Sequence, residues 1–502
     1  MSQHYPHPLY LAEQVREIDR RAIAAGENDG FDGFDLMQRA AKAAYEQLRQ
    51  RWPQTRSLGV LCGSGNNAGD GYVIAALAAR DGLAVQLIAV RDPDELKGDA
   101  ARALEMAQAA GLKAVAWQQG MVLDAEVIVD ALLGTGLGGE VREPFASVIE
   151  GINACELPVL AVDIPSGLAA DTGAVLGCAV VADVTVTFIA DKFGLHTGEA
   201  ADHVGEVVFC SLDIDAQAHR DLPPVADLLD GSVIGTGLPR RSRGSHKGDF
   251  GHVLVIGGAP GFGGAALLAS QAAARLGAGK VSLATAPEHV SASLIRTPEV
   301  MARGVRGVSD TMRLLEGADV IVIGPGLGQD AWGQGMLQAA LETGKPLVVD
   351  ADGLNLLVTH WPDEKREDWI LTPHPGEAAR LLDSSARTIQ ADRLAAVRTL
   401  QDQRGGAVVL KGAGSLVAGS RGVAVCPYGN PGMASGGMGD VLSGILGALI
   451  AQGLEVEQAA HVGITLHALA ADRAAAMEGE RGLLAGDLAS YGRFLANPDM
   501  ND

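Results

Sequence analysis

The stretch "GNPGMASGGMGDVLSGILGALIAQG", residues 429–453, gathers small residues around one acid, Asp440, and then continues into an apolar run. The apolar run predicts a buried helix, and the glycines before it form a turn whose amides face the first turn of that helix. A helix start of this kind favours an anion, either a bound phosphate or the capping carboxylate itself. A glycine turn with Asp440 as the N-cap explains the motif in isolation. The rest of the chain has to decide between these two interpretations.

The composition predicts an acidic protein of two domains. A chain of 502 residues is too long for one typical core, and its formal net charge of −22 argues against nucleic acid or an anionic membrane as partners. Every apolar stretch is interrupted before the roughly 18 to 20 residues that a membrane-spanning helix needs. The N-terminus lacks the basic start and apolar core of a secretory signal, and the five scattered cysteines lack metal-ligand spacing. We therefore expect a cytoplasmic protein with no membrane partner and reduced cysteines.

Short apolar runs alternate with Ala-rich helical stretches in both halves, which is typical of βα units in a largely parallel sheet. In the first half, a helical segment over residues 11–50 precedes predicted strands at 57–63, 84–90, 126–133, 158–164 and 184–190. In the second half, predicted strands at 252–258, 280–285, 319–324, 346–352 and 407–412 precede a helical region over 442–476. A Pro pair and several charges mark 213–231 as the junction. We expect an α/β fold with domains at 1–218 and 225–502.

Polar residues gather at the predicted strand ends of the first half. The stretch "CGSGNNAGDGYVIAALAAR" (62–80) leads from a strand through a Gly-rich loop into a helix, which suits an anionic ligand. Asp130 and Asp163 end apolar strands, where a buried carboxylate must be paired, protonated or bound to a metal. Because parallel strands end at the same edge of a sheet, we expect these segments to converge on one crevice. Local turns and caps are the alternative for each segment taken alone.

The sequence "GTGLGG" (134–139) matches the G-x-G-x-x-G pattern of dinucleotide-binding domains. It follows a predicted strand and by itself supports a dehydrogenase. Against this, Glu140, Glu143 and Pro144 stand where a helix should open onto a pyrophosphate. The glycine pattern alone is weak support for that activity.

Taken together, "GSGNNAGDG", "DALLGTGLGG" and "AVDIPSGLAADTG" closely resemble the NAD(P)H-hydrate epimerase family, also called the YjeF N-terminal domain, over about residues 10–215. The resemblance implies a Rossmann-like domain that interconverts the two C6 epimers of hydrated NAD(P)H with a potassium ion at the site. It implies a substrate contact at Asp163 and potassium coordination by Asn67, Asp130 and Ser166. Because the C6 hydroxyl lies next to the ring nitrogen, whose lone pair can help to expel it, one acid–base group is enough, and we expect Asp163 to take that role. It further implies substrate contacts at Asn66, Asn67, Ala68, Gly69, Asp70, Gly134, Thr135, Gly136, Leu137, Gly138, Gly139 and Glu140.

The second half repeats the device of a strand that feeds a glycine-rich loop, in "GHVLVIGGAPGFGG" (251–264) and "IGPGLG" (323–328). "VVDADGLNLL" (348–357) places two acids at a strand end, and "TPHPGE" (372–377) holds His374 between two prolines. "AVVLKGAGSLVA" (407–418) brings Lys411 off a strand into a glycine turn, a suitable place to hold a nucleotide. An incidental loop histidine and a surface lysine are the alternatives for these two residues.

As a set, these motifs and "GGMGDVLSG" resemble the ADP/ATP-dependent NAD(P)H-hydrate dehydratase family, which has the ribokinase-like fold, over about residues 225–495. The resemblance implies Mg²⁺ with ADP or ATP, and Asp440 as the base that takes the proton of the attacking hydroxyl. Met438 stands where the family pattern has a small hydroxyl residue, which removes one phosphate hydrogen bond. The resemblance places nucleotide contacts at Lys411, Gly412, Ala413, Gly414, Ser415 and Gly439, and hydrate contacts at Ala265, Gly326, His374 and Asp440.

We therefore expect a bifunctional, homo-oligomeric repair enzyme whose substrates are the hydrates NADHX and NADPHX. The first domain would epimerise them, and the second would dehydrate the S form at the expense of ADP, with ATP also compatible with the sequence. One alternative is an NAD-dependent dehydrogenase. Another is a vitamin-type kinase fused to a non-catalytic interaction domain, which would not need Asp130 or Asp163.

Overall fold

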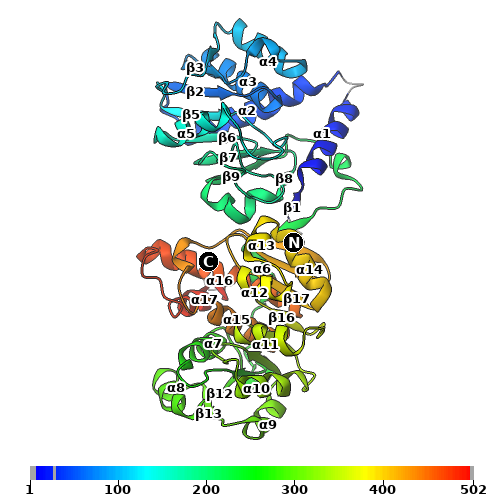
Figure 1. Cartoon of the computed structure of the whole chain (residues 1–502), viewed down its shortest axis with the longest axis vertical. Coiled ribbons are helices and arrows are strands. Elements are labelled where there is room, and N and C mark those ends of the chain that lie inside the picture. The colour runs from blue at the N-terminus through cyan, green and yellow to red at the C-terminus, as the bar shows by residue number, and fades with distance from the viewer. Residues whose placement is uncertain (1–6, 27–29, 498–502) are drawn as a thin grey trace. The chain divides into compact units, whose positions relative to one another are not determined.

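A computed structural model describes residues 7–26 and 30–497 of the chain. The chain forms two compact units, one over Pro8–Ala226 and the other from Asp227 onward together with His7. In Figure 1 the first unit is coloured from blue to green and the second from green to red. The division lies inside the predicted junction at 213–231.

The first unit is built on a parallel sheet with the strand order β4-β3-β2-β5-β6-β7-β9. All five predicted strands are present. The order reverses between β2 and β5, so the loops that follow these two strands separate and leave a crevice at the carboxyl edge of the sheet. The strands are β2 (Ser57–Cys62), β3 (Ala84–Ala89), β4 (Val115–Ala116), β5 (Val127–Ala131), β6 (Val159–Val162), β7 (Val184–Phe188) and β9 (Glu206–Cys210).

Helices cover both faces of this sheet, and a small parallel pair, β1 (His7–Tyr10) with β8 (Asp191–Lys192), lies beside it. Four helices pack on one face, and one helix packs on the other through Val148, Ile149 and Ile152. The first four are α1 (Ala12–Gly26), α2 (Gly33–Arg51), α3 (Asn66–Arg80) and α4 (Gly98–Ala109), and the fifth is α5 (Phe145–Ala154).

The single helical segment predicted over 11–50 is wrong in one respect, because the structure has two helices there. The second helix begins afresh because Asp32 caps it, accepting hydrogen bonds from the amides of Phe34 and Asp35. Residues 27–29 lie outside the described part of the chain.

The second unit has the strand order β13-β12-β11-β14-β15-β16-β17-β18-β19-β10. The strands from β13 to β17 pair in parallel, β18 is antiparallel to both of its neighbours, and the order reverses between β11 and β14. The five predicted strands of this half are present. The strands are β10 (Ala226–Leu228), β11 (His252–Ile256), β12 (Lys280–Thr285), β13 (Met301–Gly304), β14 (Val320–Ile323), β15 (Leu347–Val349), β16 (Trp369–Leu371), β17 (Ala407–Leu410), β18 (Ser415–Gly419) and β19 (Gly422–Cys426).

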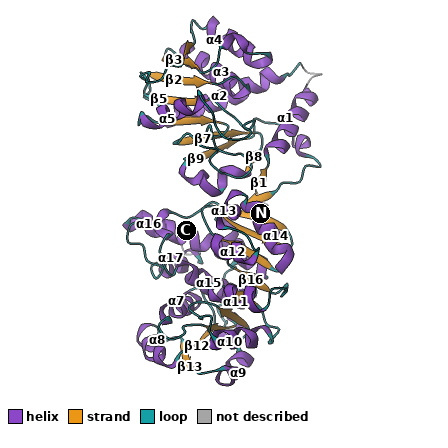
Figure 2. Cartoon of the chain, viewed as in Figure 1, coloured by secondary structure: helices purple, strands orange, loops and turns teal. Residues whose placement is uncertain are grey.

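Helices flank the strands of this unit as they do in the first (Figure 2). None of the helices in the described part of the chain is both long and apolar enough to cross a membrane. The helices are α6 (Ser232–Gly237), α7 (Gly263–Arg275), α8 (Val290–Arg296), α9 (Val308–Gly317), α10 (Ala331–Leu341), α11 (Asp352–His360), α12 (Pro375–Leu381), α13 (Ala386–Ala391), α14 (Arg393–Arg404), α15 (Met438–Ala451), α16 (Val456–Glu478) and α17 (Leu488–Leu495).

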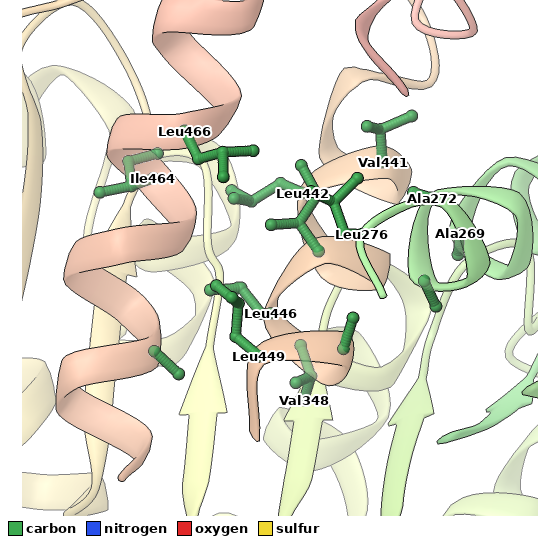
Figure 3. Packing of buried hydrophobic residues seen from close by; sticks show 14 of the residues in the cluster. Ala269, Ala272, Leu276, Val348, Val441, Leu442, Leu446, Leu449, Ile464 and Leu466 are labelled. Carbon is green, nitrogen blue, oxygen red and sulfur yellow. The ribbon is translucent and has the colours of Figure 1, made fainter. Parts of the chain in front are cut away.

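The core of the second unit is centred on α15, which lies between α7 and α16 over the sheet (Figure 3). The helical region predicted over 442–476 is two helices, α15 and α16. A Cβ atom on Gly444 would lie 2.0 Å from the carbonyl oxygen of Ala269, so only glycine allows α15 to approach α7 this closely. Gly437 lies beside Leu268, and Gln452 donates to the carbonyl of Leu276. The two helices therefore run in the same direction and begin at the same edge of the sheet.

Candidate active sites

A cavity of about 570 Å³ opens in the first unit where the strand order reverses. Its walls come from the loops after β2 and β5, from α1 and α2, and from Asp163 and Lys192. Many of the predicted substrate contacts line it: Asn66, Asn67, Asp70, Gly134, Thr135, Gly136, Leu137, Gly138 and Asp163. The Asn loop, the loop after Asp130 and the side chain of Asp163 therefore meet at one crevice, whereas Asp130 itself is fully buried and does not line it.

Four predicted substrate contacts do not line this cavity. Ala68 is fully buried in the core, and Gly69 faces the side chain of Met37. Gly139 and Glu140 are exposed at the outer end of their loop. Substrate contacts at these four positions stay predictions.

Asp130, Ser166 and Asn67 are the predicted potassium ligands, and the first two are in contact. Asp130 is fully buried, and its carboxylate accepts hydrogen bonds from the Ser166 amide at 2.8 Å and the Ser166 hydroxyl at 2.6 Å. Burial raises the pKa of Asp130 to about 6, against the effect of these hydrogen bonds. Neither polar atom of the buried Asn67 amide has a hydrogen-bond partner among the described residues.

An orphaned amide at this depth is costly unless a ligand satisfies it. With the oxygens of Asp130 and Ser166 it offers the hard oxygen donors that suit an alkali cation. The donor set therefore fits the predicted ion.

Asp163 follows β6 in a left-handed backbone conformation, with φ of 69°, which is unusual for a residue other than glycine. Its side chain is one-fifth exposed and accepts a hydrogen bond from the Nζ atom of Lys192 at 2.6 Å. Lys192 is only 1% exposed and also donates to the Thr187 hydroxyl at 2.8 Å. The sequence prediction missed Lys192, although a lysine within "FIADKFG" (188–194) was a signal.

Three further acids line the same cavity: Asp70 on α3, Asp19 on α1 and Asp99 on α4. Burial, with the nearby charges of Asp163 and Asp19, raises the pKa of Asp70 well above the usual range of a carboxyl group. Burial raises the pKa of Asp19 to about 6, although the charge of Lys192 lowers it. Asp19 was not foreseen from the sequence.

In the second unit, the loops after β11 and β14 are joined by hydrogen bonds at the reversal of the strand order. The Gly258 amide donates to Pro325 and the Ala259 amide donates to Gly326. Gly326 has a φ of 57°, and its Cβ position lies 3.3 Å from the Cβ atom of Ala265. The two predicted hydrate contacts therefore lie together.

Phe262 lies beside Gly326 and is 64% exposed. An exposed ring next to predicted substrate contacts can cover a flat ligand by stacking. This residue was not foreseen from the sequence.

The sequence left open whether Asp440 is the N-cap of α15. In the structure the N-cap is Gly437, and no side-chain hydrogen bond caps the helix. Asp440 stands in the first turn. Burial, with the charge of Asp350, raises the pKa of Asp440 to about 7, although Lys411 lowers it. The carboxyl group is thus free for another task.

Lys411 reaches the same place from the end of β17. Its Nζ atom lies 2.8 Å from Oδ1 of Asp350, and the Ser443 hydroxyl donates to Oδ2 of the same carboxylate at 2.9 Å. A Cβ atom on Gly439 would lie 3.2 Å from the Lys411 Nζ atom, which places the lysine against the start of α15. Lys411, Gly439 and Asp440 therefore share one site, as predicted.

The buried side chain of Arg393, which is 1% exposed, stabilises the glycine turn over 411–415. Its guanidinium donates to the carbonyls of Leu410 and Gly414 and to the side chain of Gln390. Burial lowers the pKa of Arg393 to about 10. The Ser415 hydroxyl closes the turn by donating to the carbonyl of Gly412 at 2.9 Å.

His374 is the N-cap of α12, and its Nδ1 atom accepts a hydrogen bond from the Gly376 amide at 3.0 Å. This capping role was not foreseen from the sequence. The side chain is about half exposed, so a contact between its ring and the substrate stays a prediction.

Two parallel α/β units, each with acids at the carboxyl edge of its sheet, define an enzyme with two catalytic domains. Residues 33–194 match the family model described as YjeF-related protein N-terminus, and residues 253–492 match the model described as NAD(P)H-hydrate dehydratase. The chain is 47% identical over 491 residues to the bifunctional NAD(P)H-hydrate repair enzyme Nnr of Coxiella burnetii, covering 98% of this chain and 99% of that protein.

The enzyme of the same name from Escherichia coli strain K12 is 43% identical over 502 residues, covering 99% of this chain and 95% of that protein. A ribokinase-like superfamily protein of Enterococcus faecalis is similar in structure, with 29% identity and a TM-score of 0.50, over 54% of this chain and 95% of that one. The chain belongs to the family of bifunctional NAD(P)H-hydrate repair enzymes. The predicted fold, Rossmann-like followed by ribokinase-like, is confirmed.

The buried pair of Lys411 and Asp350 generates a prediction about stability. Lys411→Met leaves a buried carboxylate unpaired and should lower the free energy of unfolding of the second unit by about 3 kcal/mol. Adding Asp350→Asn removes that charge and should restore part of the loss. Urea unfolding measures both effects. The exposed pair of Lys42 and Glu46 is the control, because Lys42→Met should change stability by less than about 1 kcal/mol. Equal losses in the Lys411 and Lys42 variants would contradict the prediction.

Proposed function

We propose that this chain repairs hydrated NAD(P)H in two steps at two sites. The first unit interconverts the R and S forms at C6. The second unit phosphorylates the C6 hydroxyl of the S form with ADP, or with ATP, and eliminates the phosphate. The observation that carries the proposal is the side chain of Asp440, which caps no helix and stands beside Lys411 at a helix start formed by glycines.

In the second unit, Asp440 accepts the proton of the C6 hydroxyl as that oxygen attacks the terminal phosphorus of the nucleotide. The amides at the start of α15 and the Lys411 ammonium stabilise the phosphoryl oxygens. Mg²⁺, bound with the nucleotide, would neutralise phosphate charge. The phosphorylated oxygen is a good leaving group, so the ring nitrogen expels it, and loss of a C5 proton restores the dihydronicotinamide.

In the first unit, Asp163 is an acid–base group for the exchange of the C6 hydroxyl. The ring nitrogen beside C6 supplies the electron pair that expels the hydroxyl. A potassium ion held by Asn67, Asp130 and Ser166 would satisfy the orphaned amide of Asn67 and fix the loop over 132–138. Ser166 already accepts a hydrogen bond from the Leu133 amide, which ties this loop to Asp130.

The geometry does not favour the dehydrogenase alternative. The "GTGLGG" loop does not open a helix, since α5 begins only at Phe145. A dinucleotide fingerprint needs the helix start directly after the glycines, where it meets the pyrophosphate.

A cytoplasmic location and a homo-oligomeric state remain part of the proposal. ADP is the proposed donor, and ATP is the alternative. A comparison of the two nucleotides at equal concentration, with recovery of dihydronicotinamide absorbance as the readout, decides between them.

Two single substitutions should separate the two activities. Asp440→Asn should lower nucleotide-dependent dehydration by at least about a hundredfold and leave epimerisation unchanged, because the general base is lost only in the second site. Asp163→Asn should lower epimerisation by at least about a hundredfold and leave nucleotide-dependent dehydration unchanged. Each variant is assayed with R hydrate, S hydrate and nucleotide, and each unaffected activity is the control for folding. If either variant retains both activities at wild-type rates, the assigned role of that aspartate is wrong.

The pH dependence of dehydration should follow Asp440. Because the pKa of this carboxyl is about 7 and the ionised form is the base, kcat should fall about tenfold per unit as the pH drops below 7 and level off above it. Lys411→Met should move the midpoint to higher pH, and Asp350→Asn should move it to lower pH, since these groups lower and raise the pKa of Asp440. Profiles normalised to each plateau between about pH 5.5 and 8.5 measure this. A flat wild-type profile would contradict the assignment.

A further inference from the structure

The epimerase cavity holds more titratable groups than a single acid–base residue needs. Asp19, Asp70, Asp163 and Lys192 all line it, and they come from α1, α3, the end of β6 and β8. Each carboxyl has a different environment. The division of labour among them can therefore be inferred from their contacts.

The ammonium group of Lys192 forms an ion pair with the carboxylate of Asp163. Besides the 2.6 Å contact with that carboxylate, its ammonium donates to the Thr187 hydroxyl and lies near the carbonyls of Phe188 and Ala190 at 3.4 and 3.3 Å. These acceptors exhaust the three N–H groups of a lysine and fix its position. Asp163 therefore stands in the cavity as an ion-paired carboxylate, which can accept a proton.

Asp70 has the opposite environment. Its side chain has no hydrogen-bond or ion-pair partner among the residues that the structure describes, and it lies in the first turns of α3 facing the cavity. Burial and the neighbouring carboxylates raise its pKa, which favours the protonated form at neutral pH. Two carboxyls with opposed protonation states in one site are the arrangement that general acid and general base catalysis requires.

We propose that Asp70 is the general acid and Asp163 the general base of epimerisation, and that Lys192 is the positioning residue that sets these two roles. The proposal rests on the proposed epimerase function of the first unit and deepens it. The two carboxyls come from different elements, α3 and the end of β6, and both line the cavity. The proposal assigns the departing hydroxyl to Asp70 and the returning water to Asp163.

The electron pair of the ring nitrogen forms a double bond to C6 as the C6–O bond breaks. The departing oxygen takes the proton of Asp70 and leaves as water. A water molecule then adds to the opposite face of C6, its proton passes to Asp163, and the pair of the nitrogen–carbon double bond returns to nitrogen. The net change in the enzyme is one proton moved from Asp70 to Asp163. Lys192 favours its release from Asp163, which resets the site through solvent.

The pH dependence of this step follows from all the charged groups at the cavity. Epimerisation requires protonated Asp70, so the rate should fall on the alkaline side as the pH rises through the raised pKa of Asp70. The other groups that face Asp70 or line the same cavity are Asp19 and Arg16 on α1, Cys62 at the end of β2, Asp99 on α4 and Lys192 on β8. Asp19→Asn removes a charge that raises the pKa of Asp70, so it should move the alkaline limb to lower pH.

The test measures conversion of the R hydrate to the S hydrate and, in the same protein, nucleotide-dependent dehydration of the S hydrate. Asp70→Asn should lower epimerisation at least about a hundredfold and leave dehydration unchanged, and Asp70→Glu should recover part of the rate. Lys192→Met should lower epimerisation because it removes the 2.6 Å contact that positions Asp163, and Lys192→Arg, which keeps a cationic donor, should recover part of the rate. Asp81→Asn, at the far end of α3, is the matched control and should retain the wild-type rate.

The outcomes separate two failures. If the wild-type protein does not interconvert the epimers, the proposed function of the first unit is wrong. If the wild-type protein does so and Asp70→Asn retains its rate, or Lys192→Met retains its rate, or Lys192→Arg recovers nothing of the rate that Lys192→Met loses, the proposal about these residues is wrong. Unchanged dehydration by each variant shows that the second unit has folded, and the partial rate of Asp70→Glu shows that the first unit has folded.

Discussion

The close approach of α15 to α7 is the contact on which the dehydratase site depends. Gly444 has no side chain to separate its helix from the carbonyl of Ala269, so the two helices pack almost backbone to backbone. Because they run in the same direction, the glycine loops before them lie at the same edge of the sheet. That edge also receives Lys411 from β17 and the loop after β14. The start of α15 and Lys411 thereby give an acidic protein a place where amides and one lysine lie together, which is the proposed phosphate site.

The epimerase site depends on a different feature of the fold. The strand order reverses between β2 and β5, and this reversal opens a cavity at the carboxyl edge of the sheet. In both sites the carboxyl groups owe their chemistry to burial. Burial raises the pKa of Asp440 to about 7, which suits a group that is proposed to exchange a proton. The ion pair with Lys192 holds Asp163 in place for its proposed role as a proton acceptor. A site that removes a hydroxyl and a site that phosphorylates one are thus built from the same few groups.

The sequence predicted ten of the strands and most of the residues that line the cavity, because strand ends and glycine loops are local signals. The convergence of Asn67, Asp70 and Asp163 followed from parallel topology alone. Residues that act through distant contacts were missed. Lys192 and Asp163 are in contact although they are 29 positions apart in the sequence. Arg393, at the start of α14, donates to the carbonyl of Gly414 in the 411–415 turn. The two breaks in the predicted helices were missed because caps such as Asp32 depend on the backbone angle of one residue.

The central claim, that glycine packing between α15 and α7 builds the phosphate site, is tested most directly by Gly444→Ala. Although alanine favours a helix by about 1 kcal/mol, the clash with Ala269 should lower the free energy of unfolding of the second unit by about 2 kcal/mol and weaken ADP binding. Gly317→Ala is the control, since a Cβ atom there would have no heavy atom within 4 Å and should cost nothing. Equal stability and equal ADP affinity in the two variants would contradict the account.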